Sequence, residues 1–85
     1  MYKVYGLINC NYCKNATLLL QANGLTYVYF SLDKSEDMLN EIKQKHNWRT
    51  VPLVILDGQD GEQFIGGYDD LRKHIQSLGD EDNSV

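Results

Sequence analysis

The sequence predicts an α/β domain with the element order β-α-β-α-β-β-α, in which helices flank a four-stranded mixed sheet. Its 85 residues are enough for one small domain but not for two cores. Apolar runs typical of strands alternate with segments of helical periodicity. A strand, a helix and a second strand follow one another within the first 32 residues. They predict a βαβ unit with the usual right-handed crossover.

The βαβ unit opens the chain. Residues 2–8 are apolar and aromatic apart from one Lys, so we expect them to form a buried strand. The segment after Cys10 has the periodicity of a helix, and Gly24 is a natural end for it. Residues 26–32 are rich in β-branched and aromatic side chains, which predicts the second strand. The apolar face of the helix comprises Cys13, Ala16, Leu19 and Leu20.

A second helix is predicted after Ser35, which can act as its N-cap. The acidic residues that follow Ser35 suit the positive end of a helix, and lysines stand near its C-terminal end. Trp48 is expected to cover the end of the core. The predicted apolar stripe of this helix consists of Met38, Leu39 and Ile42.

A hairpin and a last helix complete the predicted domain. Residues 53–56 are a short apolar run, and two Asp-Gly pairs mark the turn before the return strand at 63–65. Asp69 is predicted to cap the last helix, and Gly79 to end it. Its apolar positions are Leu71, Ile75 and Leu78. We therefore place the domain at residues 1–79 and a disordered acidic tail at 80–85.

Charge and hydropathy narrow the classes of partner. The formal net charge is −4, and the Lys and Arg residues are scattered, which argues against nucleic acid because phosphate binding needs a basic patch. No apolar stretch approaches the roughly 20 residues that cross a bilayer. The first residues also lack the layout of a signal peptide. We expect a cytoplasmic, monomeric protein with no membrane contact.

The pair Cys10 and Cys13 is the strongest chemical signal. It follows a predicted strand and opens a helix, the setting in which a Cys-x-x-Cys of a reducing compartment is a redox candidate. Free N–H groups and the positive helix end favour a thiolate, which is the nucleophilic form of cysteine. Cys10 is expected at the exposed helix mouth. Cys13, one turn deeper, can resolve a mixed disulfide formed on Cys10.

Two other interpretations of the pair stay open. The cysteines could be structural and buried, or they could form half of a zinc site. Tetrahedral zinc needs four ligands, whereas the chain has no other cysteine and its two histidines, His46 and His74, stand far apart in the sequence. We therefore expect no metal within one chain, while a metal shared between two chains stays open.

Two further segments have both an ordinary and a functional interpretation. Pro52, in Thr50-Val51-Pro52, is the only proline and can simply begin a strand. The segment from Gly66 to Asp70 reads as a turn and a helix start. The same glycines and helix N-terminus could also let a ligand carboxylate approach backbone N–H groups, with the Asp69 carboxylate near a ligand ammonium.

Taken together, the three segments resemble the glutaredoxin family. The family pattern is Cys-Pro-Tyr-Cys, then Thr-Val-Pro, then Gly-Gly, a small residue and Asp-Asp. Here the order and spacing match over residues 2–78, with Cys-Asn-Tyr-Cys at 10–13 and Gly-Gly-Tyr-Asp-Asp at 66–70. The resemblance implies a thioredoxin fold and a thiol-disulfide oxidoreductase that uses glutathione as cosubstrate. Its implied partners are proteins with disulfides, ribonucleotide reductase among them.

The resemblance also implies roles for individual residues. Cys10 resembles the nucleophile and Cys13 the resolving cysteine. A cis Pro52 would follow a Val51 whose backbone pairs with glutathione. Arg49 resembles the basic residue that meets the glycyl carboxylate. The complete implied glutathione site consists of Tyr12, Arg49, Thr50, Val51, Pro52, Gly67, Tyr68 and Asp69.

Three departures from the pattern affect what the resemblance implies. Asn11 replaces the usual proline and adds a backbone donor near the sulfurs, which bears on the redox potential. Leu7 stands where the family often has a lysine, so one glutathione contact is lost. Tyr68 is bulkier than the usual Cys or Ser and is expected to narrow the groove.

Alternative functions are also compatible with this pattern. One is a thioredoxin-like electron donor served by a reductase protein, although the chain lacks a Trp before Cys10 and a Gly-Pro between the cysteines. Another is a dimer that binds an iron–sulfur cluster with the help of glutathione. A third is an inert scaffold, which would require Cys10 to be unreactive.

Overall fold

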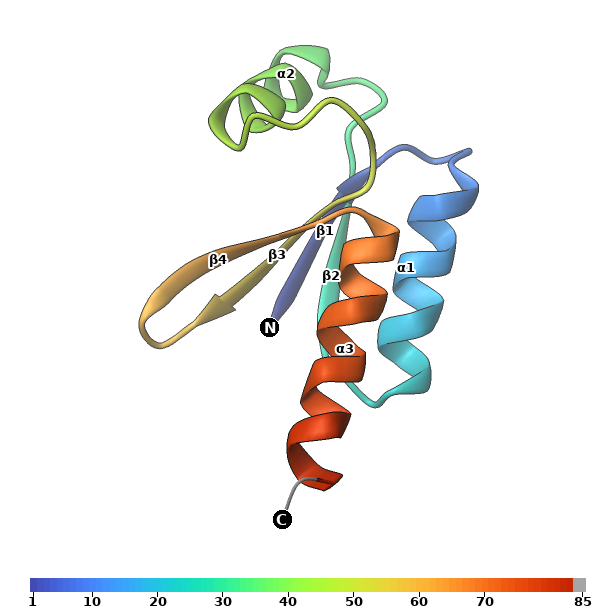
Figure 1. Ribbon diagram of the computed structural model, residues 1–85. Helices are drawn as coiled ribbons and strands as arrows, with labels where there is room; N and C mark the ends of the chain where they lie inside the picture. The colour runs from blue at the N-terminus through green and yellow to red at the C-terminus, as the bar shows by residue number, and fades with distance from the viewer. Residues whose placement is uncertain (84–85) are drawn as a thin grey trace.

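The computed structural model describes residues 1–83, with side chains up to residue 78, and it has the predicted element order (Figure 1). The elements are β1 (Tyr2–Gly6), α1 (Asn11–Ala22), β2 (Tyr27–Ser31), α2 (Glu36–Lys45), β3 (Leu53–Gly58), β4 (Gly61–Gly66) and α3 (Tyr68–Asn83). Within residues 1–83, no helix has the length and apolar character needed to cross a membrane.

The sheet is mixed, with the strand order β2-β1-β3-β4. β1 is parallel to β2, as the α1 crossover requires, and antiparallel to β3. In this register Val4 lies between Tyr29 of β2 and Val54 of β3. β3 and β4 form the predicted antiparallel hairpin, which closes where Gly58 pairs with Gly61. Because β1 is a central strand, the loop that follows it and leads to Cys10 lies near the middle of one end of the sheet.

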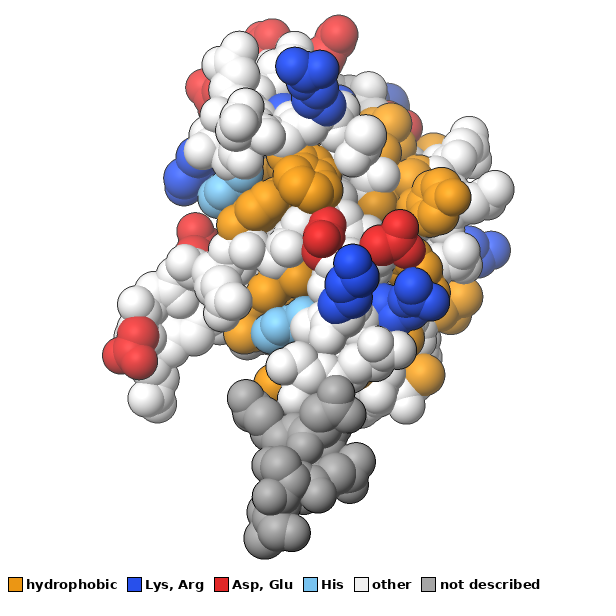
Figure 2. All heavy atoms as spheres, viewed as in Figure 1, with side chains coloured by type: hydrophobic (Ala, Val, Ile, Leu, Met, Phe, Trp, Pro, Cys, Tyr) orange, Lys and Arg blue, Asp and Glu red, His pale blue; other side chains and the backbone are white. Residues whose placement is uncertain are grey.

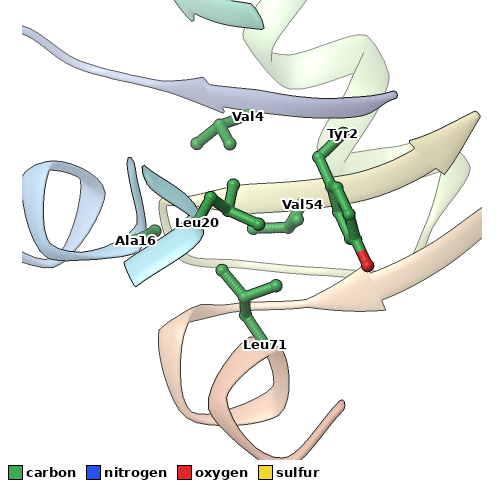
Figure 3. Close-up of a cluster of buried hydrophobic side chains, with 6 residues drawn as sticks. All are labelled: Tyr2, Val4, Ala16, Leu20, Val54 and Leu71. Atoms are coloured by element: carbon green, nitrogen blue, oxygen red, sulfur yellow. The ribbon is translucent and has the colours of Figure 1, made fainter. Parts of the chain in front are cut away.

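The main core lies between the sheet and the pair α1 and α3, which run side by side across one face (Figure 1). Alternate residues of β1 are buried, as expected for a strand with one face on the core. Side chains from β1, α1, β3 and α3 point toward one another (Figure 3). This cluster consists of Tyr2, Val4, Ala16, Leu20, Val54 and Leu71. Each fully buried Leu contributes about 1.5–3 kcal/mol relative to an exposed one.

A smaller cluster joins α2 to the end of the sheet near the cysteines. Its buried members are Leu32, Leu39 and Leu53, with Trp48 packed against them, so the predicted role of Trp48 is confirmed. Met38 is 50% exposed, so its predicted place in the apolar stripe of α2 is wrong. Neighbouring residues of a helix point in directions about 100° apart, and here Leu39 takes the buried one.

The helix ends follow the sequence in part. Gly24 adopts φ 67° and ends α1 in a Schellman motif. Its N–H donates to Gln21 O, and the N–H of Leu25 donates to Leu20 O. Ser35 occupies the N-cap position of α2, but its side chain makes no capping hydrogen bond, so that part of the prediction is wrong. Its backbone, at φ −130° and ψ 57°, lies outside the extended region typical of a capping residue.

α3 differs from the sequence prediction at both ends. Gly67 precedes the helix, and the Asp70 carboxylate accepts its N–H at 3.1 Å, so Asp70 rather than Asp69 provides the side-chain cap. This is the returning half of a capping box, with the acidic residue three positions after the N-cap. The helix also continues through Gly79 to Asn83, because glycine in a helix costs only about 1 kcal/mol and keeps its N–H. The boundary at residue 79 and the disordered tail stay predictions, and residues 84–85 lie outside the described part.

Candidate active site

Cys10 is the N-cap of α1, at the end of the loop that leaves β1. Its backbone is extended, and its Sγ accepts the backbone N–H of Cys13 at 3.1 Å. A sulfur thus takes the place that a Ser or Asp oxygen usually has at a helix start. The side chain is partly exposed and its thiol is free. The backbone N–H of Cys13 and the positive end of α1 both face this sulfur.

Cys13 lies one turn deeper and has no exposed surface. Burial, followed by the hydrogen bond with Cys10, raises the pKa of its thiol to about 11. At neutral pH Cys13 is therefore a protonated thiol that no outside reagent touches directly. The two sulfurs differ in the way the sequence predicted, with an accessible one at the helix mouth and a sheltered one behind it.

Two residues near the cysteines were missed by the sequence interpretation. Gly6 ends β1, and a Cβ added there would lie 2.5 Å from Cys13 Sγ and 2.7 Å from the Tyr29 hydroxyl oxygen. Tyr29 donates its hydroxyl to the carbonyl oxygen of Leu7 at 2.5 Å. A glycine inside a strand pattern signals close approach of another group, so Gly6 could have been noticed, whereas no sequence pattern distinguishes Tyr29 from the other tyrosines.

The loop before Cys10 is held by Asp33, which follows β2. Its carboxylate accepts the backbone N–H of Ile8 at 2.9 Å and the hydroxyl of Ser31. The Ser31 hydrogen bond, together with backbone N–H groups, holds the pKa of Asp33 below its usual value. Asp33, which follows β2, thus fixes the loop that leads to Cys10.

A groove of about 290 Å³ lies between the start of β3 and the start of α3, and Tyr12, which stands between the two cysteines in the sequence, is part of its lining. The peptide bond between Val51 and Pro52 is cis, as the family resemblance implies. The rings of Tyr12 and Tyr68 lie 6.2 Å apart across the groove. Of the predicted glutathione site, the groove brings together Tyr12, Thr50, Val51, Pro52, Gly67, Tyr68 and Asp69.

Arg49 is the predicted residue that the groove does not include. It lines an adjoining pocket of about 300 Å³ at the end of α2, and Trp48 lines both. The direction of the chain toward Arg49 is set by Asn47, which has φ 51° at the end of α2. The Asn47 N–H donates to Gln44 O and the Trp48 N–H donates to Lys43 O, which makes a second Schellman motif.

Apolar and acidic surface meet at the groove. Figure 2 shows apolar side chains gathered between α2 and the start of α3, with acidic side chains beside them. The acidic residues of that helix start are Asp69, which is exposed, and Asp70, which is bonded to Gly67. In the part of the chain that the structure describes, no three His, Cys, Asp or Glu side chains are grouped so that they could hold a metal ion.

Comparison with known proteins identifies the family. Residues 3–60 match the family model for glutaredoxin. The chain belongs to the glutaredoxin family. Glutaredoxin 3 of Escherichia coli strain K12 is 30% identical over 69 residues, which is 81% of this chain and 78% of that protein. Members of this family are thiol-disulfide oxidoreductases, and so is this glutaredoxin.

Solved structures agree on the fold. A wheat glutaredoxin superposes with a TM-score of 0.78 at 23% identity, over 88% of this chain and 70% of the wheat chain. A buckwheat glutaredoxin–glutathione complex has a TM-score of 0.75 at 29% identity, over 89% of this chain and 69% of the other. The thioredoxin fold expected from the resemblance is therefore confirmed, and the family's partner is glutathione.

Proposed function

We propose that this glutaredoxin reduces protein disulfides and glutathione mixed disulfides through Cys10 and Cys13, with glutathione as the reductant. The observation that carries the proposal is the asymmetry of the two sulfurs. Cys10 is partly exposed and accepts an N–H from the first turn of α1, whereas Cys13 is fully buried behind it. Such an arrangement separates the nucleophile from the resolving group, as a two-step exchange requires.

The exchange proceeds through a mixed disulfide. The Cys10 thiolate attacks one sulfur of the substrate disulfide, that S–S bond breaks, and the departing thiolate takes up a proton. Cys13 then loses its proton and attacks Cys10 Sγ, so the Cys10–Cys13 disulfide forms and the second substrate sulfur leaves as a thiol. Two glutathione molecules restore the dithiol and become glutathione disulfide. Glutathione can also resolve a glutathionyl adduct on Cys10 directly.

The groove supplies the proposed glutathione site. Val51, just before the cis Pro52, offers its backbone to the cysteinyl part, and Tyr12 flanks the sulfur. The γ-glutamyl carboxylate meets the N-terminus of α3 at Tyr68 and Asp69, because free N–H groups in the first turn of a helix attract anions, while the Asp69 carboxylate pairs with the ammonium. Thr50 completes the wall of the groove.

Arg49 is proposed to receive the glycyl carboxylate from the adjoining pocket that it lines next to Trp48. The proposed setting is a monomer in the cytoplasm, where glutathione keeps thiols reduced. Ribonucleotide reductase is the proposed protein substrate.

The first test couples the reduced protein to a small glutathione mixed disulfide, glutathione reductase and NADPH, and follows NADPH consumption. We expect turnover by the wild type, none by Cys10→Ser, and retained activity in Cys13→Ser, because glutathione can resolve the adduct without Cys13. If nothing turns over although Cys10 is readily alkylated, the proposed glutathione site is wrong, and a thioredoxin-like or cluster-binding function takes its place.

The groove has its own test with a matched control. Asp69→Asn should raise the KM for glutathione about 2- to 5-fold, the effect of weakening one exposed charged contact. Asp37→Asn makes the same change in the first turn of α2, outside the groove, and should leave the KM unchanged. Equal KM values for the two variants would remove Asp69 from the site.

A further inference from the structure

The side chain of Tyr29 reaches the buried side of the cysteine pair from the middle of β2. Its ring is half-buried and packs against the main core cluster. Its hydroxyl oxygen and Cys13 Sγ both border the small space that Gly6 leaves by having no side chain. The phenol is therefore placed next to the sulfur of Cys13.

The hydroxyl has a fixed chemical role at this position. Burial is the main cause that raises the pKa of Tyr29 far above its usual value, and the adjacent Cys13 adds to it. Tyr29 therefore keeps its proton at every pH at which the enzyme works, and it acts as a hydrogen-bond donor rather than a base. In the reduced protein this proton points to the Leu7 carbonyl oxygen.

Cys13 needs such a donor only during the second half of the reaction. A thiolate with no exposed surface receives no hydrogen bond from water, and an unsatisfied buried charge is costly. The Tyr29 hydroxyl can rotate about its C–O bond without movement of the ring. The backbone N–H of Leu7 also favours the charged form of Cys13, so two donors converge on one sulfur.

We propose that Tyr29 is the positioning residue of the resolving step, and that its hydroxyl turns from the Leu7 carbonyl to Cys13 Sγ when this sulfur becomes a thiolate. The proposal rests on the proposed function. The Cys13 proton goes to the departing thiolate, which leaves as a thiol. Cys13 Sγ bonds to Cys10 Sγ while the bond from Cys10 to the substrate sulfur breaks. The Tyr29 proton is not transferred.

Other ionisable groups surround this pair. Cys10 raises the pKa of both Cys13 and Tyr29, and the charge of Asp33 also raises the pKa of Tyr29. A pocket of about 370 Å³ connects Cys10 with Tyr29 and is also lined by Lys14 and Tyr27. Cys10 lines this pocket and Cys13 does not, so water that enters it reaches the sulfur that Cys13 attacks but not Cys13 itself.

The test follows the two steps separately. Reduced protein is mixed with glutathione disulfide, quenched with acid, and analysed by mass spectrometry for the Cys10 adduct and for the Cys10–Cys13 disulfide. In Tyr29→Phe the adduct should form at the wild-type rate, whereas ring closure should be about tenfold slower, the effect of one hydrogen bond to a charged group. The pH midpoint of closure should rise by about one unit. Tyr27→Phe, on the same strand and the same pocket, should change neither step.

Each outcome has a definite meaning. Closure of Tyr29→Phe at the wild-type rate and pH midpoint would overturn the role of Tyr29. Failure of the wild type to form an adduct would overturn the proposed function instead. If Tyr29→Phe does not fold, 3-fluorotyrosine placed at position 29 keeps the ring and provides a more acidic donor. We then expect a lower pH midpoint of closure, and an unchanged or higher one refutes the proposal.

Discussion

Gly6→Ala should disturb both the stability of the protein and the second sulfur. The new methyl group would lie 2.5 Å from Cys13 Sγ and 2.7 Å from the Tyr29 hydroxyl oxygen, distances that real Cβ atoms essentially never show. Overpacking of this kind costs about 1–3 kcal/mol. We expect the upper part of that range, because Cys13 has no exposed surface and cannot move into solvent.

The measurement is the free energy of unfolding of the reduced protein in urea, together with thermal unfolding. For a domain of this size about 2–3 kcal/mol corresponds to a fall in Tm of roughly 10–20 °C. Ring closure between the cysteines should also slow, while formation of the Cys10 adduct should not. Gly58→Ala is the matched control in the same sheet, because the nearest atom to its Cβ would be 3.9 Å away. If both variants are equally stable, the space at Gly6 has no importance.

The remaining predictions concern pH and backbone conformation. Burial raises the pKa of Cys13 from 9.0 to about 11. As the pH rises, the unfolded chain therefore loses this proton before the folded protein does. The reduced protein should lose up to ~3 kcal/mol of stability between about pH 9 and 11. Urea midpoints of Cys13→Ala should fall less steeply over that range. Gly66→Ala, at φ 124° and with a Cβ 2.5 Å from Asp70 Oδ2, should cost about 2–3 kcal/mol in the same assay, and wild-type stability would contradict the geometry. Asn47 has φ 51°, so Asn47→Ala should lower the free energy of unfolding by about 1 kcal/mol and Asn47→Gly by about 0.5 kcal/mol or less. Equal losses of stability in the two variants would show that the left-handed conformation is unimportant.

The periodicity of the sequence predicts most of the fold. The apolar run at residues 2–8 predicts a buried strand, and helical spacing in the first helix places Ala16 and Leu20 in the core, where the structure has them together with Val4. Gly24 ends α1 because only a residue that tolerates positive φ fits there. The predictions fail where two neighbouring residues compete for one role. Asp69 and Asp70 both suit a helix start, and only the three-dimensional path of the chain at Gly67 decides between them.

The site was predictable as far as it consists of motifs. Cys10, Pro52 and Tyr68 belong to segments whose residue types are chemically distinctive. Gly6 and Tyr29 lie beside Cys13 on two different strands, and of the two only Gly6, as a glycine inside a strand pattern, carries a local signal. Arg49 was predicted with the groove but lines the neighbouring pocket, because the end of α2 turns at Asn47 and no pattern gives the direction of that turn.

The complete burial of Cys13 has a consequence for experiments on the motion of the protein. A thiol reagent in excess can label this sulfur only when the first turn of α1 opens, so the labelling rate in native buffer measures how often that opening occurs. In a Cys10→Ser background Cys13 is the only thiol of the chain. When the turn recloses faster than the reagent reacts, the labelling rate gives the free energy of opening. When the reagent reacts faster than the turn recloses, the labelling rate equals the opening rate. Cys13 is thus a built-in probe of local unfolding in the first turn of α1.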